Sequence, residues 1–235
     1  MCHEETECVR AHDALFRGMA CFWKYSPKFV EYVRSHFARS VAFDDNYASA
    51  HAWLARVLLF QSTLKWDSDS NLKQTALLHA QKAVAINAQL PYALSILGWT
   101  YLWFKQQDLA ISSCRQAVSL DPNNAEAQVF LSFCLSASGF DEEGLFYIQK
   151  ALRHNPLSST FYEFTFGLAH YVVKDYEQAV AAFKRGSEIY NTFAPNLIYL
   201  CITYHILGLK KELKLSRESA LSIMGGDRSK MIESL

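Results

Sequence analysis

The sequence predicts an all-α protein made of repeated pairs of antiparallel helices, and three observations support this fold class. Glycine (9) and proline (5) make up about 6% of the 235 residues, against roughly 12% in average proteins. Because β-sandwiches and barrels need many tight turns, this scarcity favours helices. Hydrophobic residues at 51% and charged residues at 20% exclude a disordered chain. Finally, a pattern of small, apolar and proline residues recurs about every 34 positions, which indicates a repeat array.

The repeat is defined by prolines and by small residues at a constant spacing. Pro122 and Pro156 are 34 residues apart, and each follows an apolar, helix-like run. Small residues occupy the eighth position of four consecutive units, at spacings of 34, 35 and 34; they are Gly98, Ser132, Gly167 and Cys201. This pattern resembles the tetratricopeptide repeat (TPR), in which small residues lie where two helices cross. The resemblance implies a TPR α-solenoid, a right-handed superhelix of antiparallel helix pairs.

We expect one TPR array of about six units over residues 11–226, after an extension over 1–10 and before a tail over 227–235. The first and last units are atypical, as is usual at the ends of a solenoid. The predicted units are 11–45, 48–88, 91–124, 125–158, 160–193 and 194–226. The second unit carries a nine-residue insertion around Trp66.

One stretch resembles a membrane span in length. Residues 83–104 contain no charged side chain, and this stretch is long enough to cross a bilayer. However, Asn87, Gln89 and Pro91 lie within the stretch, and the repeat register divides it there. We therefore predict two buried helices and no membrane span.

The resemblance also predicts where a partner binds. In TPR arrays the first helix of each unit lines a concave groove, and here the groove positions are mostly apolar and aromatic. Exposed apolar surface of this extent marks an interaction site, so we expect a protein or peptide partner such as an amphipathic helix. The alternative is that these side chains pack between helices as core residues. The candidate partner-binding residues are Trp99, Trp103, Tyr92, Phe133, Phe161, Phe164, Tyr171, Arg56 and His205.

The charge of the chain narrows the choice of partner. Lys and Arg total 23, as do Asp and Glu, so the formal net charge is zero and binding to nucleic acid is not expected. Some TPR proteins hold the C-terminal carboxylate of a chaperone with Lys and Asn side chains. Here the corresponding positions hold Ala52, Arg56, Ile96, Glu126 and Phe130, of which only Arg56 suits a carboxylate.

No motif for chemistry is present in the sequence. The chain has no nucleophile elbow, Walker loop, dinucleotide-binding turn or HExxH, so we expect no enzyme activity, cofactor or metal. His170 and His205 fall on first helices and are interpreted as structural. The six cysteines include no CxxC pair, and Glu4, Glu5 and Glu7 stand where a signal peptide would be apolar. We therefore expect a cytoplasmic protein.

A second resemblance extends beyond the repeat itself. Segments 37–41, 44–55 and 98–102 resemble the TPR module C-terminal to bacterial class III adenylate cyclases and to winged-helix regulators. This resemblance implies an alternative function, a bacterial regulatory or sensor module of a signalling protein. Such a module would act by self-association, as a homodimer, or by binding a small apolar ligand.

Overall fold

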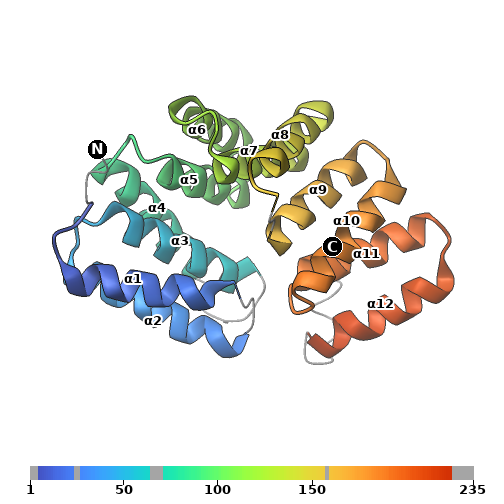
Figure 1. The fold of residues 1–235 in the computed structure, drawn as a ribbon, viewed down its shortest axis with the longest axis horizontal. Helices are drawn as coiled ribbons and strands as arrows, with labels where there is room; N and C mark the ends of the chain where they lie inside the picture. Colours follow the sequence, from blue (N-terminus) through green and yellow to red (C-terminus); the bar gives the residue numbers. More distant parts are fainter. Residues whose placement is uncertain (1–4, 24–26, 64–70, 157–158, 224–235) are drawn as a thin grey trace. The chain divides into compact units, whose positions relative to one another are not determined.

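The structure is a computed structural model, and it describes residues 5–23, 27–63, 71–156 and 159–223 (Figure 1). These ranges contain twelve α-helices and no β-strand, so the all-α prediction is confirmed. The insertion around Trp66 and the tail over 227–235 lie outside the described residues. The helices are α1 (Val9–Phe22), α2 (Pro27–Phe43), α3 (Ala48–Thr63), α4 (Leu72–Ile86), α5 (Pro91–Trp103), α6 (Gln107–Leu120), α7 (Ala125–Ala137), α8 (Asp141–His154), α9 (Thr160–Val172), α10 (Tyr176–Ile189), α11 (Ala194–Ile206) and α12 (Lys210–Ile223).

The chain divides into two compact units, unit 1 over Met1–Pro122 and unit 2 over Asn123–Leu235. In each unit three helix pairs follow one another, and each helix packs against the next along the chain. The first helices, α1, α3 and α5 in unit 1 and α7, α9 and α11 in unit 2, also contact the next first helix of their unit. This is the packing of stacked antiparallel helix pairs (Figure 1). That all six pairs form one continuous array stays a prediction.

Small residues lie where the two helices of a pair cross. A Cβ atom added at Gly98 of α5 would lie 2.7 Å from the carbonyl oxygen of Ala110 on α6. In unit 2, a Cβ atom at Gly167 of α9 would overlap the ring of Phe183 on α10. Both approaches are closer than a Cβ atom tolerates, and this is the physical reason for the small residue at the eighth position of these units.

The turn between the two helices of a pair has the same backbone conformation in four consecutive pairs. Lys105, Gly139, Lys174 and Gly208 all have positive φ, at 58°, 82°, 64° and 71°. Their spacings of 34, 35 and 34 match those of the small residues. Glycine adopts this left-handed conformation freely, whereas the same conformation costs about 1–2 kcal/mol at a lysine. The repeat geometry therefore fixes the turn, even where the residue does not favour it.

The uncharged stretch over 83–104 is divided as predicted. Helix α4 ends at Ile86 and α5 begins at Pro91, a residue well suited to the first turn of a helix. Among the described helices, none combines the length and the apolar character needed to cross a bilayer. Lys210 and Lys211 begin α12, and both are exposed.

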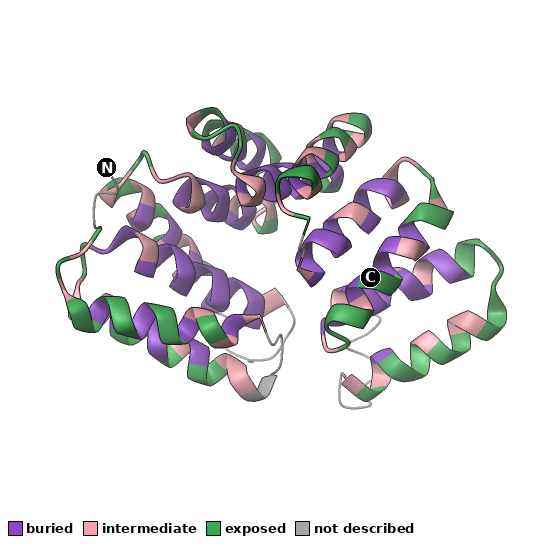
Figure 2. Cartoon of the chain, in the orientation of Figure 1, coloured by how far each residue is buried: buried purple, intermediate pink, exposed green. Residues whose placement is uncertain are grey.

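Burial differs sharply between helices (Figure 2). In α3 every side chain from Ala50 to Gln61 is buried. In α12 only Ala220 is buried, and Leu215 is 57% exposed. A helix buried on all sides belongs to the interior of a stack, and α3 contacts both α1 and α5.

Candidate functional site: the aromatic faces of the first helices

In unit 1, four aromatic rings surround the guanidinium group of Arg56 on α3. Its Cζ atom lies 4.8 Å from the ring centroid of Phe22 and 5.0 Å from that of Trp23, both from the end of α1. The ring of Trp53 lies at 5.1 Å and that of Tyr92 at 5.9 Å. Because ring faces carry partial negative charge, this arrangement, here named the Arg56 cluster, stabilises a cation that is only 1% exposed.

The Arg56 cluster reaches solvent at its rim. Arg56 Nη1 donates a hydrogen bond of 3.0 Å to the Tyr92 hydroxyl, and the side chains of Tyr92 and Trp23 are half-buried. At the end of α5, Trp103 is 40% exposed, with the ammonium group of Lys73 at 5.7 Å from its ring. Half-exposed aromatic rings of this kind are common at protein interfaces because one ring supplies much contact area.

In unit 2, the first helices carry a series of aromatic rings that pack on one another. Phe133 of α7 lies 5.8 Å from Phe161 and 6.2 Å from Phe164, both on α9. Phe164 meets Tyr199 of α11 at 5.5 Å, and Tyr199 meets Tyr171 at 5.6 Å with perpendicular rings. Burial raises the pKa of both tyrosine hydroxyls, so they remain neutral at physiological pH. The series ends in two half-buried tyrosine rings.

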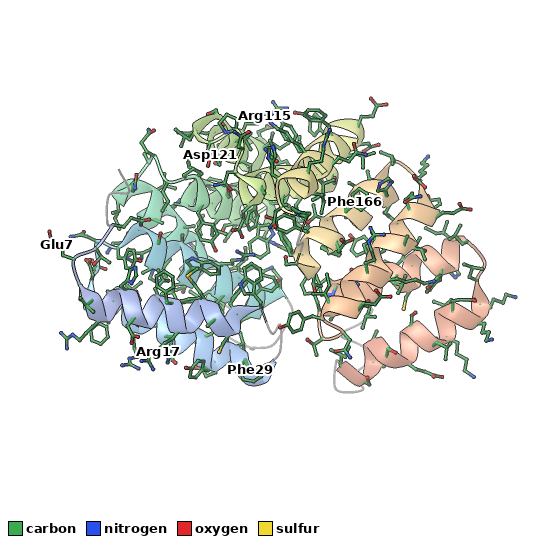
Figure 3. The ribbon with its side chains drawn as sticks, in the orientation of Figure 1. Glu7, Arg17, Phe29, Arg115, Asp121 and Phe166 are labelled. Carbon is green, nitrogen blue, oxygen red and sulfur yellow. The ribbon has the colours of Figure 1, made fainter. Side chains whose placement is uncertain are left out.

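Beside this series lies a charged pair that joins α9 to α10. Glu163 of α9 is 7% exposed and accepts a hydrogen bond of 3.0 Å from Nε of Arg185 on α10. Figure 3 labels Phe166, and the guanidinium group of Arg185 also lies 5.8 Å from its ring. A buried carboxylate is stable only with such a partner, so this ion pair is structural.

The nine predicted partner-binding residues fall into three groups. Five are buried, and this placement matches the core alternative for those side chains: Arg56, Trp99, Phe133, Phe161 and Phe164. Two are half-buried, Tyr92 and Tyr171, and two are exposed, Trp103 and His205. The structure brings Arg56 and Tyr92 together in unit 1, and Phe133, Phe161, Phe164 and Tyr171 in one series in unit 2. Partner contact by any of the nine stays a prediction.

The two histidines on first helices have different surroundings. His170 Nδ1 lies 3.1 Å from a carboxylate oxygen of Asp175, the residue that caps α10 by accepting a hydrogen bond from the Gln178 amide. His170 is buried, so this contact ties the end of α9 to the start of α10. His205, near the end of α11, is exposed.

A histidine pair in unit 1, formed by buried His51 and half-buried His79, was not predicted. His51 Nδ1 lies 2.8 Å from His79 Nδ1, and His51 Nε2 lies 3.1 Å from the carbonyl oxygen of Asp45. Since a carbonyl only accepts, neutral His51 carries its hydrogen on Nε2, and the His79 Nδ1–H donates to His51. Burial lowers the pKa of His79 to about 4 and also lowers the pKa of His51. The partners are 28 residues apart, so no local spacing reveals them.

The described residues do not assemble into a metal site. Within them, no group of three or more His, Cys, Asp or Glu side chains is arranged to hold an ion. Five described cysteines are free thiols, three of them buried: Cys114, Cys134 and Cys201. Burial raises the pKa of the Cys201 thiol to about 11, which disfavours the reactive thiolate.

The chain resembles known proteins in its fold. No protein-family model matches the sequence, and no curated protein matches it. Solved structures do match. Cut9, in the crystal structure of the APC/C hetero-tetramer Cut9–Hcn1, aligns over 100% of this chain with a TM-score of 0.69 and 14% identity. A thermophilic TPR protein from Thermus thermophilus aligns over 77% of this chain, with a TM-score of 0.62 and 20% identity.

A third structure, the human IFIT1 dimer with PPP-AAAA, aligns over 90% of this chain with a TM-score of 0.74 and 19% identity. The chain spans 43% of the Cut9 chain and 49% of the IFIT1 chain, but 94% of the Thermus thermophilus protein. At these identities the likeness concerns the fold alone. The chain has the all-α TPR solenoid fold that the sequence predicts.

Proposed function

We propose that this protein is a non-catalytic scaffold that binds a protein or peptide segment, such as an amphipathic helix, along the first helices of its repeats. The observation that carries this proposal is a set of partly exposed aromatic rings at the first helices of both units. In unit 1 these are Trp23, Tyr92 and Trp103, and in unit 2 they are Tyr171 and Tyr199. Rings anchored on a rigid core bind at low entropic cost, because their side chains are already ordered.

The TPR solenoid fold supports a binding function in a general way. Among the solved structures that resemble the chain, Cut9 is part of a hetero-tetramer with Hcn1. The buried rings are less suited to direct contact with a partner. Trp99 and Phe164 are 3% and 4% exposed, so their role in binding would be to hold the outer rings in place.

The test is a pair of ring deletions with a matched control. A Trp103→Ala/Tyr171→Ala variant removes one partly exposed ring from each unit. Phe146→Ala removes a ring that is 54% exposed but lies on a second helix, α8. Proteins captured from native cell extract by wild type and by Phe146→Ala, and lost with the double variant at unchanged helicity, would support the proposal.

Equal capture by all three proteins would show that the first-helix rings do not bind the partner. The variants Trp99→Ala and Phe164→Ala serve a different purpose, since each opens a cavity in a buried core and should lower stability by roughly 3–5 kcal/mol. Loss of capture in those two variants therefore says nothing about direct contact. The regulatory alternative, with its homodimer or small apolar ligand, stays a prediction, as do the cytoplasmic location and the absence of catalysis.

A further inference from the structure

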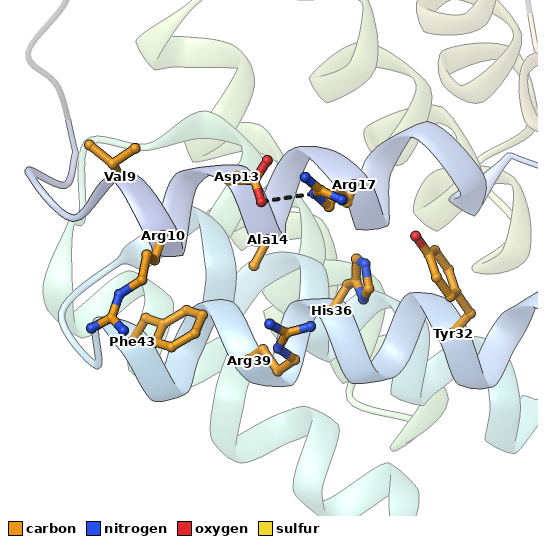
Figure 4. Close-up of a pocket in the computed structure, with 9 residues that line it drawn as sticks. All are labelled: Val9, Arg10, Asp13, Ala14, Arg17, Tyr32, His36, Arg39 and Phe43. Carbon is orange, nitrogen blue, oxygen red and sulfur yellow. Dashed lines mark hydrogen bonds and ion pairs between the residues drawn. The ribbon is translucent and has the colours of Figure 1, made fainter.

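A cavity of about 580 Å³ lies between α1 and α2, the first helix pair of unit 1 (Figure 4). None of its lining residues belongs to the Arg56 cluster or to the rings proposed to bind a protein. Its volume is within the range of small-molecule sites, roughly 300–1,000 Å³. Its wall combines cationic side chains from both helices with the apolar side chains of Val9, Ala14 and Phe43.

The cavity carries an excess of positive charge. Arg10 and Arg17 of α1 and Arg39 of α2 line it, and Asp13 is the one carboxylate among its lining residues, which leaves a net charge of +2 with His36 neutral. Arg17 Nε lies 2.8 Å from Asp13, but both side chains are more than half exposed, so this pair is weak. An anion in the cavity competes easily with such a pair.

Within the part of the chain that the structure describes, the other two arginines have no acidic partner. The guanidinium groups of Arg10 and Arg39 both lie over the ring of Phe43, at 4.7 and 5.8 Å from its centroid. Among the described residues, neither group forms a hydrogen bond or an ion pair. Two like charges on one ring repel each other, and a shared anion would relieve that repulsion and use the free N–H donors.

His36 adds a buried polar atom to the same wall. Its side chain is 9% exposed, and its Nδ1 atom is buried with no hydrogen-bond partner among the described residues. Its ring lies 4.2 Å from the ring of Tyr32, which also lines the cavity. Burial lowers the pKa of His36, and the charges of Arg39 and Arg17 lower it further. A buried polar atom without a partner is costly, so it is characteristic of a site completed by a ligand.

Helix geometry explains why these residues meet. Arg10, Asp13 and Arg17 are three and four residues apart on α1, so they share one helix face. His36, Arg39 and Phe43 have the same spacings on α2. Packing of α1 against α2 brings the edges of the two faces together around the cavity (Figure 4).

We propose that this cavity binds a small organic phosphate. The phosphate group would lie between the guanidinium groups of Arg10 and Arg39, with the organic part against Val9, Ala14 and Phe43. A phosphate monoester carries close to two negative charges, which matches the net charge of the cavity. Guanidinium groups also present paired N–H donors that fit phosphate oxygens. The site is separate from the proposed protein-binding face and does not depend on it.

Isothermal titration of the full chain with phenyl phosphate tests the proposal, with inorganic phosphate and phenylacetate titrated in parallel. Phenyl phosphate should bind most tightly of the three. An Arg10→Gln/Arg39→Gln variant should bind it at least about tenfold more weakly, since charge-assisted hydrogen bonds are lost. The matched control is Arg34→Gln, also on α2, whose guanidinium group pairs with Glu31 and does not line the cavity. It should bind within about twofold of wild type, because its guanidinium group does not line the cavity.

A second readout locates the ligand. The NMR signal of the His36 ring, identified by its absence in a His36→Gln variant, should shift as phenyl phosphate is added. An unshifted His36 signal would place the ligand elsewhere and overturn the proposal. So would unchanged affinity in the double variant at unchanged helicity, equal affinity for inorganic phosphate or phenylacetate, or no binding of phenyl phosphate at roughly millimolar concentration.

Discussion

The aromatic faces of the two units are built from similar residues but differ in the groups that contact the ring faces. In unit 1 the ring faces of Phe22, Trp23 and Trp53 surround a cation, the guanidinium group of Arg56. In unit 2 the rings pack on each other, and Tyr171 and Tyr199 meet edge to face at 90°. An aromatic ring is negative on its face and positive on its edge.

The comparison shows that the same repeat accepts two sources of positive charge next to a ring face. In unit 2 the source is the edge of another ring, and each such pair contributes about 0.5–1.5 kcal/mol beyond its buried area. In unit 1, Trp53 also meets Phe22 and Trp23 edge to face, at 78° and 89°, and a buried guanidinium group is a second source, for which the interaction reaches about 2 kcal/mol. Unit 1 therefore adds one buried charged residue to edge-to-face ring pairs of the kind that unit 2 also has.

The largest expected effect comes from a feature that the two units share. Phe37 in unit 1 and Phe183 in unit 2 are 0% exposed, and each ring packs against a glycine of the partner helix, Gly18 and Gly167. Phe37→Ala and Phe183→Ala should each lower the free energy of unfolding by roughly 3–5 kcal/mol, because each leaves a cavity at a helix crossing.

Urea denaturation followed by circular dichroism measures both losses. Phe146→Ala is the control, since a 54% exposed ring should cost less than about 0.5 kcal/mol. If either buried variant lost no more than this control, the glycine–phenylalanine crossing would not be the common core of the two units.

A loss of stability of intermediate size should distinguish the two units. Arg56→Lys keeps the charge but removes the planar group that stacks on the rings, so we expect a loss of about 2 kcal/mol in unit 1. Tryptophan fluorescence during urea denaturation reports this loss selectively, because all five tryptophans lie in the first 122 residues.

The matched substitution in unit 2 is Arg185→Lys. Arg185 is about half exposed and pairs with Glu163, which a lysine also does, so we expect a change below about 1 kcal/mol by circular dichroism. Equal losses in the two variants would mean that the rings around Arg56 contribute no special stabilisation.

The last prediction is a pH dependence of unit 1. Burial lowers the pKa of His79 from 6.5 to about 4, so the unfolded chain binds a proton that the folded chain does not. The stability contributed by neutral His79 is therefore present above about pH 6.5, falls as the pH is lowered, and is lost below about pH 4.

His79→Gln should flatten this dependence, because glutamine does not titrate. The measurement is the urea midpoint of tryptophan fluorescence at several pH values between 4 and 7. The difference between wild type and variant isolates His79 from carboxylates that titrate in the same range. An equally steep dependence in the variant would assign the effect to other groups.

Local features of the repeat were predictable because they depend on residues close in sequence. The scarcity of turn residues and the 34-residue period predict helix pairs, and Pro91 indicates where one helix begins. Gly98 and Gly167 lie at crossings because any side chain there would collide with the partner helix.

The exposure of the aromatic residues was less predictable. A helical pattern that is apolar on every side does not show which rings face solvent, and α3 proved to be buried all around. Trp99 and Trp103 are one turn apart on α5, yet they are 3% and 40% exposed. The difference depends on the neighbouring helices, which the local sequence does not describe.

By itself, the sequence determined the all-α fold class, the period of the helix pairs and the positions where they cross, because backbone sterics and hydrophobic periodicity act over short distances. Only the tertiary structure decided which charged and polar groups meet. Arg56 and Tyr92 are 36 residues apart, His51 and His79 are 28 apart, and Arg10 and Arg39 come from different helices. Such contacts depend on how side chains pack between elements, and packing is a property of the assembled helices.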